Sequence, residues 1–466
     1  MVWTSKQISQ ALNVDFKSED NFHKIQFNSK DIKKNDIFIA LKGGARDGHE
    51  FVLDAFKNGA GIAIVSDDIE AVPKDKLIKV NNSFEALGAL AEYKRQNSKA
   101  KFIGITGSVG KTSTKDIVGL VLSAFGKTFI SRGNFNNHIG VPINLASMEG
   151  DEDFAVIEMG MNKAGEISAL TKQVTPDVAI ITSVAPAHLE FFDSVEQIAD
   201  AKSEIFQGLD INYGVAILNR DISTYKRCME NIDIAGVGNI KTFGKSKYAD
   251  VRLKSYTIIN NQVKLIYKVF TEEVKIVMPI LPKHMAVNFA AGFAVVHALG
   301  FGSDIDLQKA ANSLIEFKPR IGRGRVIEIN KGNKKYTVIA DYYNASPESM
   351  QAGLEYLQQF DNPKKIGILG DMRELGRDSL NIHKLAIPYI VKSGVKKLFL
   401  VGEIMPQIAK DFPKDILVFT FNNSDELAAN ISSYIEGGEV IFIKGSLGIG
   451  LKKVAAMLGV GAEDAI

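Results

Sequence analysis

Short apolar runs alternate along most of the chain with segments whose apolar residues follow helical spacing. "FAVIEMG", "DVAIITSV" and "YGVAILN", for example, are almost continuously apolar. Parallel strands that are covered by helices have this composition. From about residue 101, the pattern therefore predicts strand, helix, strand repeats of an α/β fold.

Between residues 251 and 280 the pattern changes, because apolar and polar residues alternate, as in "VRLKSYTI" and "VKLIYKVF". This spacing predicts an antiparallel hairpin or small sheet added to the parallel sheet. The apolar segment at 286–300 then predicts a helix that returns to the core.

Two further changes in pattern divide the chain. Short apolar segments at 36–41 and 60–65 precede a predicted helix at 84–96, and the polar "RQNSKAK" that follows is typical of a linker. After 318–325, apolar runs again alternate with helical segments, which predicts a doubly wound, Rossmann-like domain. A chain of 466 residues is too long for one core. We therefore expect domains at 1–98, 99–320 and 321–466.

The stretch "GITGSVGKTSTK" joins a predicted strand to a predicted helix through a glycine-rich turn. Gly107 and Gly110 allow backbone N–H groups to point at an anion, and the helix adds the positive end of its dipole. Lys111 can reach the β- and γ-phosphates, and the Thr112 hydroxyl can bind Mg²⁺. Ile105 stands where the strict Walker pattern has glycine, so we predict a variant nucleotide loop. An ordinary glycine-rich turn would not need Lys111 and Thr112 together.

Three side chains are candidates for a metal site: Glu158 ends a predicted strand, His188 follows the next one, and Lys202 lies on a predicted helix after the histidine loop. Glu158 is well placed to hold Mg²⁺ directly or through water, and the apolar "VIEMGMN" disfavours a surface glutamate. His188 is either structural or a ligand of a second metal. Lys202 would have to be neutral, or an anion such as a carbamate, to lie beside Mg²⁺. Charge alone favours a solvent-facing lysine there.

Polar residues at two other places are suited to phosphate or carboxylate oxygens. Asn136 and Asn137, in "RGNFNNHIGVP", offer amides, although a surface turn is the alternative. Asp341 ends a predicted strand, and a helix is expected to begin near Ser346 and Pro347. Arginines near the second boundary could neutralise a phosphoryl group or be solvated linker charges. These are Arg320, Arg323 and Arg325.

Composition excludes several functional classes. The net charge is +2, from 56 basic and 54 acidic residues, so neither a nucleic-acid surface nor a polybasic membrane patch is expected. The single cysteine, Cys228, excludes an internal disulfide and a Cys-rich zinc site. The sequence has no apolar run long enough for a membrane span and no signal-peptide pattern, so we expect a cytoplasmic protein.

Several motifs along nearly the whole chain resemble the Mur ligase family. In order, they are "GITGSVGKTSTK", "NFNNHIGVP", "EMGMNKAGEI", "TSVAPAHLEFF", "AKSEIF", "HMAVNFAAGFAV" and "DYYNASPESM". The resemblance implies an ATP-dependent amide ligase of peptidoglycan precursor synthesis that works through an acyl phosphate. It also implies an N-terminal module for a UDP-sugar, a central ATPase, and a C-terminal Rossmann-like domain that closes with the amino component.

Within the family, "DYYNASPESM" and "FIALKGGARDGHEF" are most similar to the members that join D-Ala-D-Ala to UDP-MurNAc-tripeptide. The implied substrates are these two small molecules, the implied cofactors are ATP and two Mg²⁺ ions, and a monomer is expected. The alternatives are a sister ligase that adds another amino acid, a folylpolyglutamate synthase-like ligase, a P-loop ATPase switch and a phosphoryl-transferring kinase. The Asp-Asn-Pro-Arg signature of the members that add a diamino acid is not found.

The resemblance also implies roles for individual residues. Lys111, Lys202 and His188 are implied as catalytic, with Lys202 carbamylated. Thr112, Glu158, His188 and Lys202 are the implied metal ligands. The implied ATP-binding residues are Gly107, Ser108, Gly110, Lys111, Thr112, Ser113, Asn136, Asn137, Asn288, Arg323 and Asp341. The implied substrate-binding residues are Ser29, Lys30, Gly44, Asp47, Gly48, Tyr343 and Asn344.

Two positions depart from the family pattern. Asn28, Ser29 and Lys30 stand where the uridine motif usually has Asp-Ser-Arg. Leu447 stands where a basic residue is common in relatives.

Overall fold

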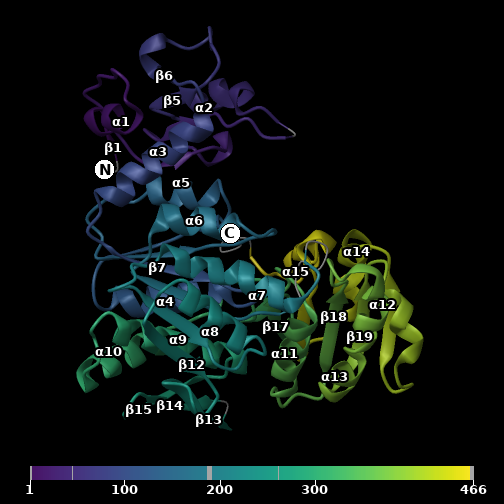
Figure 1. The fold of residues 1–466 in the computed structure, drawn as a ribbon. Coiled ribbons are helices and arrows are strands. Elements are labelled where there is room, and N and C mark those ends of the chain that lie inside the picture. The colour runs from purple at the N-terminus through teal and green to yellow at the C-terminus, as the bar shows by residue number, and fades with distance from the viewer. Residues whose placement is uncertain (1–2, 45, 186–191, 261, 462–466) are drawn as a thin grey trace.

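The computed structural model describes residues 3–44, 46–185, 192–260 and 262–461, which form a three-domain α/β fold (Figure 1). The N-terminal domain lies above the central domain in this view, and the C-terminal domain lies beside the central one. The predicted fold class is confirmed. Among the described residues, no helix has the length and apolar character needed to cross a membrane.

The N-terminal domain contains a small parallel sheet in which apolar residues of every strand are buried. Its strands, in order, are β3 (Ile25–Gln26), β4 (Ile37–Ile39), β5 (Ile62–Val65) and β6 (Leu77–Lys79). Beside it, β1 (Trp3–Thr4) pairs antiparallel with β2 (Asn21–Phe22). The helices are α1 (Ser5–Leu12), α2 (Val52–Lys57) and α3 (Ser83–Gln96).

The central domain is built on a sheet with the strand order β15-β14-β13-β12-β11-β10-β7-β9-β8. The parallel strands are β7 (Lys101–Thr106), β8 (Thr128–Ile130), β9 (Phe154–Glu158), β10 (Val178–Ile181), β11 (Val215–Asn219) and β12 (Asn239–Gly244). β13 (Val251–Ile259), which pairs parallel with β12, continues the sheet into antiparallel β14 (Gln262–Val269) and β15 (Glu272–Pro279). The predicted antiparallel addition is thus part of the same sheet.

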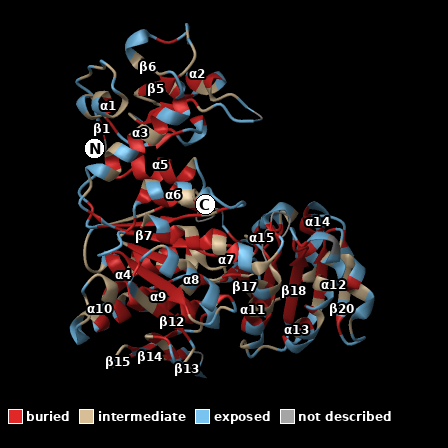
Figure 2. Cartoon of the chain, viewed as in Figure 1, coloured by how far each residue is buried: buried red, intermediate tan, exposed pale blue. Residues whose placement is uncertain are grey.

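Helices cover both faces of the central sheet, as the near-continuous apolar strands predict. α4 (Lys111–Ser123), α9 (Lys283–Ala298) and α10 (Asp304–Ile315) share one apolar core with the sheet. The other face packs against α5 (Gly140–Ala146), α6 (Glu166–Val174), α7 (Val195–Ser203) and α8 (Tyr225–Ile234). Figure 2 shows the buried residues concentrated in these layers. The helix predicted after the glycine-rich turn is α4, which ends at Ser123.

The C-terminal domain has the strand order β16-β17-β21-β18-β19-β20. Its strands are β16 (Arg325–Lys331), β17 (Lys334–Asp341), β18 (Lys365–Gly370), β19 (Val395–Val401), β20 (Leu417–Phe421) and β21 (Val440–Lys444). β16 is antiparallel to β17, and the other pairs are parallel. α11 (Pro347–Gln358) and α13 (Ile387–Lys392) pack on one face, and α14 (Ser424–Tyr434) and α15 (Lys452–Met457) on the other. α12 (Ser379–Lys384) precedes α13.

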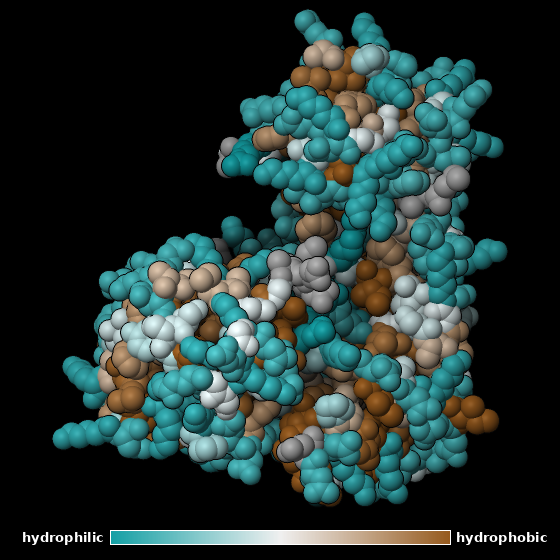
Figure 3. Space-filling model, turned by 180° about the vertical axis from the view of Figure 1, so that it is seen from behind, coloured by the Kyte–Doolittle hydropathy of each residue, from teal (hydrophilic) through white to brown (hydrophobic). Residues whose placement is uncertain are grey.

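The three domains are not joined equally. Ile143 and Ala146 of α5, a central helix, belong to the same apolar core as the N-terminal sheet, and Trp3 Nε1 donates to the Ala146 carbonyl oxygen at 2.8 Å. Between the central and C-terminal domains, the Tyr256 hydroxyl donates to Gln359 Oε1 at 2.9 Å. A space-filling view shows a broad recess between the N- and C-terminal domains (Figure 3). The N-terminal domain is therefore fused to the central one.

We expect Ile143→Ala to destabilise both fused domains, because it opens a cavity in their shared core. Such a change lowers the free energy of unfolding by about 3 kcal/mol. Trp3 is the only tryptophan of the chain and is fully buried. Urea unfolding followed by Trp3 emission and by ellipticity should shift to lower urea with both probes. Leu53→Ala, at a side chain that is 44% exposed, is the control. A shift seen by Trp3 emission alone would contradict a shared core.

Candidate active site

The glycine-rich turn between β7 and α4 forms a tight loop against the end of β10. A Cβ on Gly107 would lie 2.0 Å from Thr182 Oγ1, so only glycine fits there. Gly110 has φ +85° at the N-terminus of α4. Ser183 fixes the loop from outside, since its carbonyl oxygen accepts from Ser108 N at 2.9 Å and its hydroxyl from Val109 N at 2.8 Å. The loop shape that the sequence predicts is therefore held by the neighbouring strand.

Lys111 lies in the curve of this loop. Its Nζ donates to the carbonyl oxygens of Gly107 at 2.7 Å and Ser108 at 3.2 Å. Burial lowers the pKa of Lys111, and the nearby Glu158 carboxylate opposes this. Thr112, the next residue, is buried at the start of α4. The Lys111 ammonium is therefore placed so that it can exchange its hydrogen bonds to these carbonyl oxygens for hydrogen bonds to a phosphate in the loop.

Glu158 ends β9 with its side chain only 2% exposed. Asn136 Nδ2 donates to its Oε1 at 2.8 Å. Oε2 has no hydrogen-bond partner among the described residues. A buried carboxylate oxygen without a donor is costly, and a divalent cation would satisfy it. This orphaned atom fits the predicted metal role.

The two candidate asparagines, Asn136 and Asn137, form hydrogen bonds with different parts of the structure. Asn136 contacts Glu158, whereas Asn137 accepts hydrogen bonds from the N–H groups of Ile139 and Gly140 at 3.1 and 2.9 Å, at the start of α5. The sequence left both equally suited to the site. The geometry brings Asn136 to the site and uses Asn137 in the local turn.

Lys202 lies in the last turn of α7 and is 2% exposed. No hydrogen bond or ion pair holds its Nζ within the part of the chain that the structure describes. Burial lowers the pKa of Lys202 well below its usual value, and repulsion from Lys111 lowers it further. The solvent-facing lysine that charge alone favours is therefore wrong. His188 lies outside the described residues.

Further predicted residues lie where the central and C-terminal domains face each other. Asn288, on α9, is buried, and its Nδ2 is 3.2 Å from where a Cβ on Gly110 would be. The Arg323 guanidinium lies 4.0 Å from the centroid of the Tyr343 ring. Arg320 is not a solvated linker charge, since its Nε and Nη2 donate to Asp116 of α4 at 2.6 and 2.7 Å.

Asp341 and Lys444 form a pair at the carboxyl ends of β17 and β21. Lys444 Nζ donates to Asp341 Oδ2 at 2.7 Å and to the Asn344 carbonyl oxygen at 3.1 Å. Burial raises the pKa of Asp341, and Lys444 opposes this. The predicted helix start is confirmed, because Ser346 caps α11 and Pro347 is its first residue. Arg325 begins β16.

The predicted substrate residues of the N-terminal domain lie apart from the phosphate loop, in that domain. Asp47 Oδ1 accepts from the His49 backbone N–H at 2.9 Å, and this bond lowers the pKa of Asp47. A Cβ on Gly48 would lie 2.7 Å from Leu41 N. Ser29 is buried, whereas Lys30 and Gly44 are exposed.

One cluster of that domain has a metal-like composition. Ligand atoms of Asp47, His49 and Asp67 lie within 4.8 Å of one another. However, His49 Nδ1 contacts Asp47 Oδ1 at 2.5 Å, and His49 Nε2 accepts from Ser66 N at 2.9 Å. Both ring nitrogens are therefore used by the fold, and we assign no metal to this cluster.

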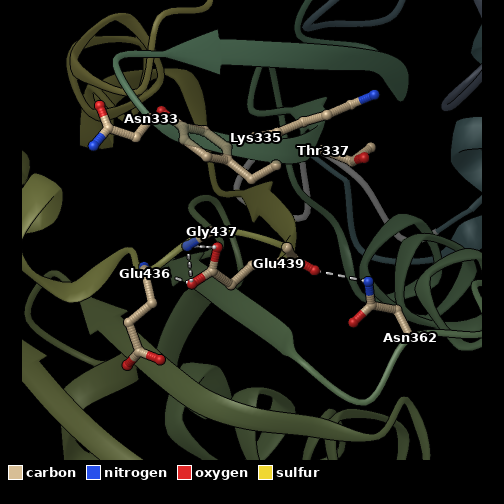
Figure 4. Close-up of a pocket in the computed structure, with 9 residues that line it drawn as sticks. Asn333, Lys335, Thr337, Asn362, Glu436, Gly437 and Glu439 are labelled. Carbon is tan, nitrogen blue, oxygen red and sulfur yellow. Dashed lines mark hydrogen bonds between the residues drawn. The ribbon is translucent and has the colours of Figure 1, made fainter.

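A hollow of about 420 Å³ lies at the opposite, amino end of the C-terminal strands (Figure 4). Of its two glutamates, Glu439 accepts from the backbone N–H groups of Glu436 and Gly437 at 2.7 and 2.8 Å. Asn362 Nδ2 donates to the Gly438 carbonyl oxygen at 2.9 Å. Ligands of open α/β sheets bind at the carboxyl ends of strands, so this hollow is not assigned a function.

Three charged residues near the site were missed from the sequence: Lys115, Asp116 and Lys444. Lys115 stands one turn after Lys111, on the helix face that also carries Val118 and Leu122. A lysine on an apolar helix face is the signal that could have identified it. Lys444 ends an apolar run, which equally indicated a strand-end charge.

Comparisons with known proteins show the class of this chain. Residues 21–95 match the description "Mur ligase family, catalytic domain", 105–296 match "Mur ligase middle domain", and 322–447 match "Mur ligase, glutamate ligase domain". The chain belongs to the Mur ligase family. The resemblance predicted from its motifs is confirmed.

Individual relatives narrow the comparison. The chain is 44% identical over 454 residues to a UDP-N-acetylmuramoyl-tripeptide--D-alanyl-D-alanine ligase of Rickettsia prowazekii, covering 97% of this chain and 99% of that one. A ligase of the same name from Bacillus subtilis is 31% identical, over 93% and 92% of the two chains.

Solved structures agree with these relatives. A crystal structure of MurF from Acinetobacter baumannii has a TM-score of 0.83 at 29% identity, covering 98% of both chains. MurF of Thermotoga maritima in complex with ADP has a TM-score of 0.75 at 27% identity, covering 94% of this chain and 97% of that one.

We expect Lys444→Met to destabilise the C-terminal domain more at pH 8 than at pH 5. Without the ammonium, the folded-state pKa of Asp341 rises further above its unfolded value, so the fold loses stability as pH rises through that range. At pH 8 the loss should be about 3 kcal/mol, as for other broken buried pairs. Thermal unfolding at both pH values measures it.

The control for this experiment is Lys444→Met combined with Asp341→Asn, which removes the titrating group. Its stability relative to Asp341→Asn alone should be the same at both pH values, because neither variant carries the titrating carboxyl group. An equal loss at pH 5 and pH 8 in the single variant would show that Asp341 is not the group that Lys444 compensates.

Proposed function

We propose that this chain is an ATP-dependent ligase that joins D-Ala-D-Ala to UDP-MurNAc-tripeptide in peptidoglycan precursor synthesis, forming a C–N bond. The observation that carries the proposal is similarity over nearly the full length to enzymes named for this reaction. The site supports it, since Lys111, Glu158 and Lys202 are buried or half-buried around a phosphate loop. The structural relative in complex with ADP supports the use of ATP.

The reaction begins with transfer of the γ-phosphoryl group of ATP to the terminal carboxylate of the tripeptide. Lys111 leaves the loop carbonyls and offsets the charge on the transferring group, and Asn288 contacts the loop from α9. The carboxylate becomes an acyl phosphate, whose phosphate is a good leaving group. The amine of D-Ala-D-Ala then attacks the carbonyl carbon, and the tetrahedral centre collapses to an amide and phosphate.

Two Mg²⁺ ions fit the donors of this site. Thr112, Glu158, His188 and a carbamylated Lys202 are the proposed ligands, and Glu158 Oε2 is the atom that most needs one. When bound, the ions neutralise phosphate charge and orient the oxygens. Lys202 fits carbamylation because burial and repulsion from Lys111 lower its pKa and so favour the neutral amine, which attacks CO₂ to form an N–C bond and releases a proton.

The proposed division of labour follows three domains, 1–98, 99–320 and 321–466. The N-terminal domain binds the UDP-sugar through Ser29, Lys30, Gly44, Asp47 and Gly48. The central domain binds ATP through Gly107, Ser108, Gly110, Lys111, Thr112, Ser113, Asn136 and Asn137, with Asn288, Arg323 and Asp341 completing the site. Tyr343 and Asn344 of the C-terminal domain contact substrate as the recess closes and excludes water. The protein acts as a monomer in the cytoplasm.

Phosphate release tests the ligase reaction directly. With ATP and Mg²⁺, we expect strong release only when UDP-MurNAc-tripeptide and D-Ala-D-Ala are both present, because the acyl phosphate is made on one and consumed by the other. The product should be heavier than the tripeptide by one dipeptide less water. Release with a single amino acid would change the substrate, whereas release indifferent to both would favour an ATPase switch.

We expect Lys202→Ala to abolish ligation, since no carboxylate can then form at this position. Added acetate or propionate should restore part of the activity by occupying the vacated space. Thermal unfolding with and without ADP checks that the variant still folds and binds nucleotide. Full activity of the variant without any added carboxylate would refute the carbamate.

A further inference from the structure

Lys115 is the most deeply buried cation of the phosphate-loop helix. It stands one turn after Lys111 on α4, and its side chain is 0% exposed. The proposed reaction assigns a role to Lys111 but none to Lys115. A buried ammonium is retained only where it is paired, so its neighbours indicate its role.

The neighbours of Lys115 form a row of alternating charge. Its Nζ lies 3.8 Å from Glu158 Oε2 on one side and 3.8 Å from Asp116 Oδ1 on the other. Asp116 is in turn held by the guanidinium of Arg320. The row therefore runs from the proposed metal ligand to the segment that enters the C-terminal domain.

The contact between Lys115 and Glu158 is electrostatic and is not a hydrogen bond. Lys115 Nζ donates a hydrogen bond to the Gly133 carbonyl oxygen at 3.1 Å. Its distance of 3.8 Å from Glu158 Oε2 is too long for a hydrogen bond. Burial lowers the pKa of Lys115, while both carboxylates oppose this. Glu158 thus has a counter-charge beside it but keeps an oxygen free.

We propose that Lys115 is a positioning residue: a resident counter-cation that balances Glu158 in the empty site and gives up this role when a divalent cation binds. The inference rests on the proposed function. Because the ammonium remains 3.8 Å from the ligand oxygen, it also repels the incoming cation. Lys115 therefore raises the Mg²⁺ concentration at which the site is half-saturated.

The charges of Lys115 and Asp116 change the Mg²⁺ affinity of the site in opposite directions. Removing the ammonium of Lys115 leaves Glu158 with Lys111 as its remaining nearby lysine, so the empty site is destabilised and its affinity for a divalent cation rises. Removing the charge of Asp116 makes the surroundings more positive, so affinity falls. If Lys115 served only to fill space, replacing it with methionine would leave the affinity of the site for a cation unchanged.

The experiment measures thermal unfolding at a fixed ADP concentration while Mg²⁺ is varied, and takes the Mg²⁺ concentration that gives half of the stabilisation. For Lys115→Met we expect a lower unfolding temperature without Mg²⁺ and a half-saturating concentration about tenfold lower than that of the native chain. For Asp116→Asn, this concentration should be about threefold higher.

Lys365→Met is the matched control. Lys365 is also a buried lysine whose Nζ donates to backbone carbonyls, those of Gln358 and Ser393, but it lies in the C-terminal domain. This variant should lose stability without any change in half-saturating Mg²⁺. If Lys115→Met does not fold, Asp116→Asn still tests the inference. The Asp116 side chain is 17% exposed, so this variant is expected to fold.

The outcomes separate this inference from the function on which it rests. If the native chain gains no stability from ADP and Mg²⁺ together, the proposed nucleotide and metal site is wrong. If it does, and Lys115→Met or Asp116→Asn leaves the half-saturating Mg²⁺ unchanged or moves it the other way, the counter-cation role of Lys115 is overturned.

Discussion

The buried carboxylate of Glu158 is the constraint on which the site depends. A charge at 2% exposure must be compensated within a few ångström, and the central domain supplies an amide and two lysines for this purpose. Asn136 comes from the loop before α5, and Lys111 and Lys115 come from successive turns of α4. The phosphate loop, the asparagine loop and the end of β9 are thus drawn together around one negative charge.

The second organising feature is the unequal attachment of the outer domains. The N-terminal domain shares an apolar core with α5, which follows the asparagine loop, so this domain has a fixed position relative to the phosphate loop. The C-terminal domain is joined through polar contacts such as Tyr256 with Gln359 and Tyr356 with the Ile280 carbonyl oxygen, and through the Ile280 side chain, which packs at the edge of its core. Interfaces of this kind permit domain movement. Asp341, Arg323 and Tyr343 lie beyond this interface, in the C-terminal part of the chain.

Much of the fold was readable from the sequence, because parallel strands in an α/β protein are apolar throughout and glycine-rich turns punctuate them. The phosphate loop, the antiparallel addition and the helix start at Ser346 followed from these local signals. β16 was not predicted, since half-exposed residues on an edge strand carry a weak pattern. The choice between Asn136 and Asn137, and the burial of Lys202, depend on contacts between distant segments, which spacing along the chain does not encode.

Two buried lysines near the site, Lys115 and Lys202, differ in the charges that surround them. Lys115 lies between Asp116 and Glu158, and both carboxylates favour its charged form. Lys202 has no such partner among the described residues, and Lys111 repels its charge. Burial disfavours the ammonium in both, and within the described part of the chain only Lys115 of the two has carboxylates that oppose this. Since CO₂ reacts with the neutral amine, this difference supports the carbamylation proposed for Lys202 and not for Lys115.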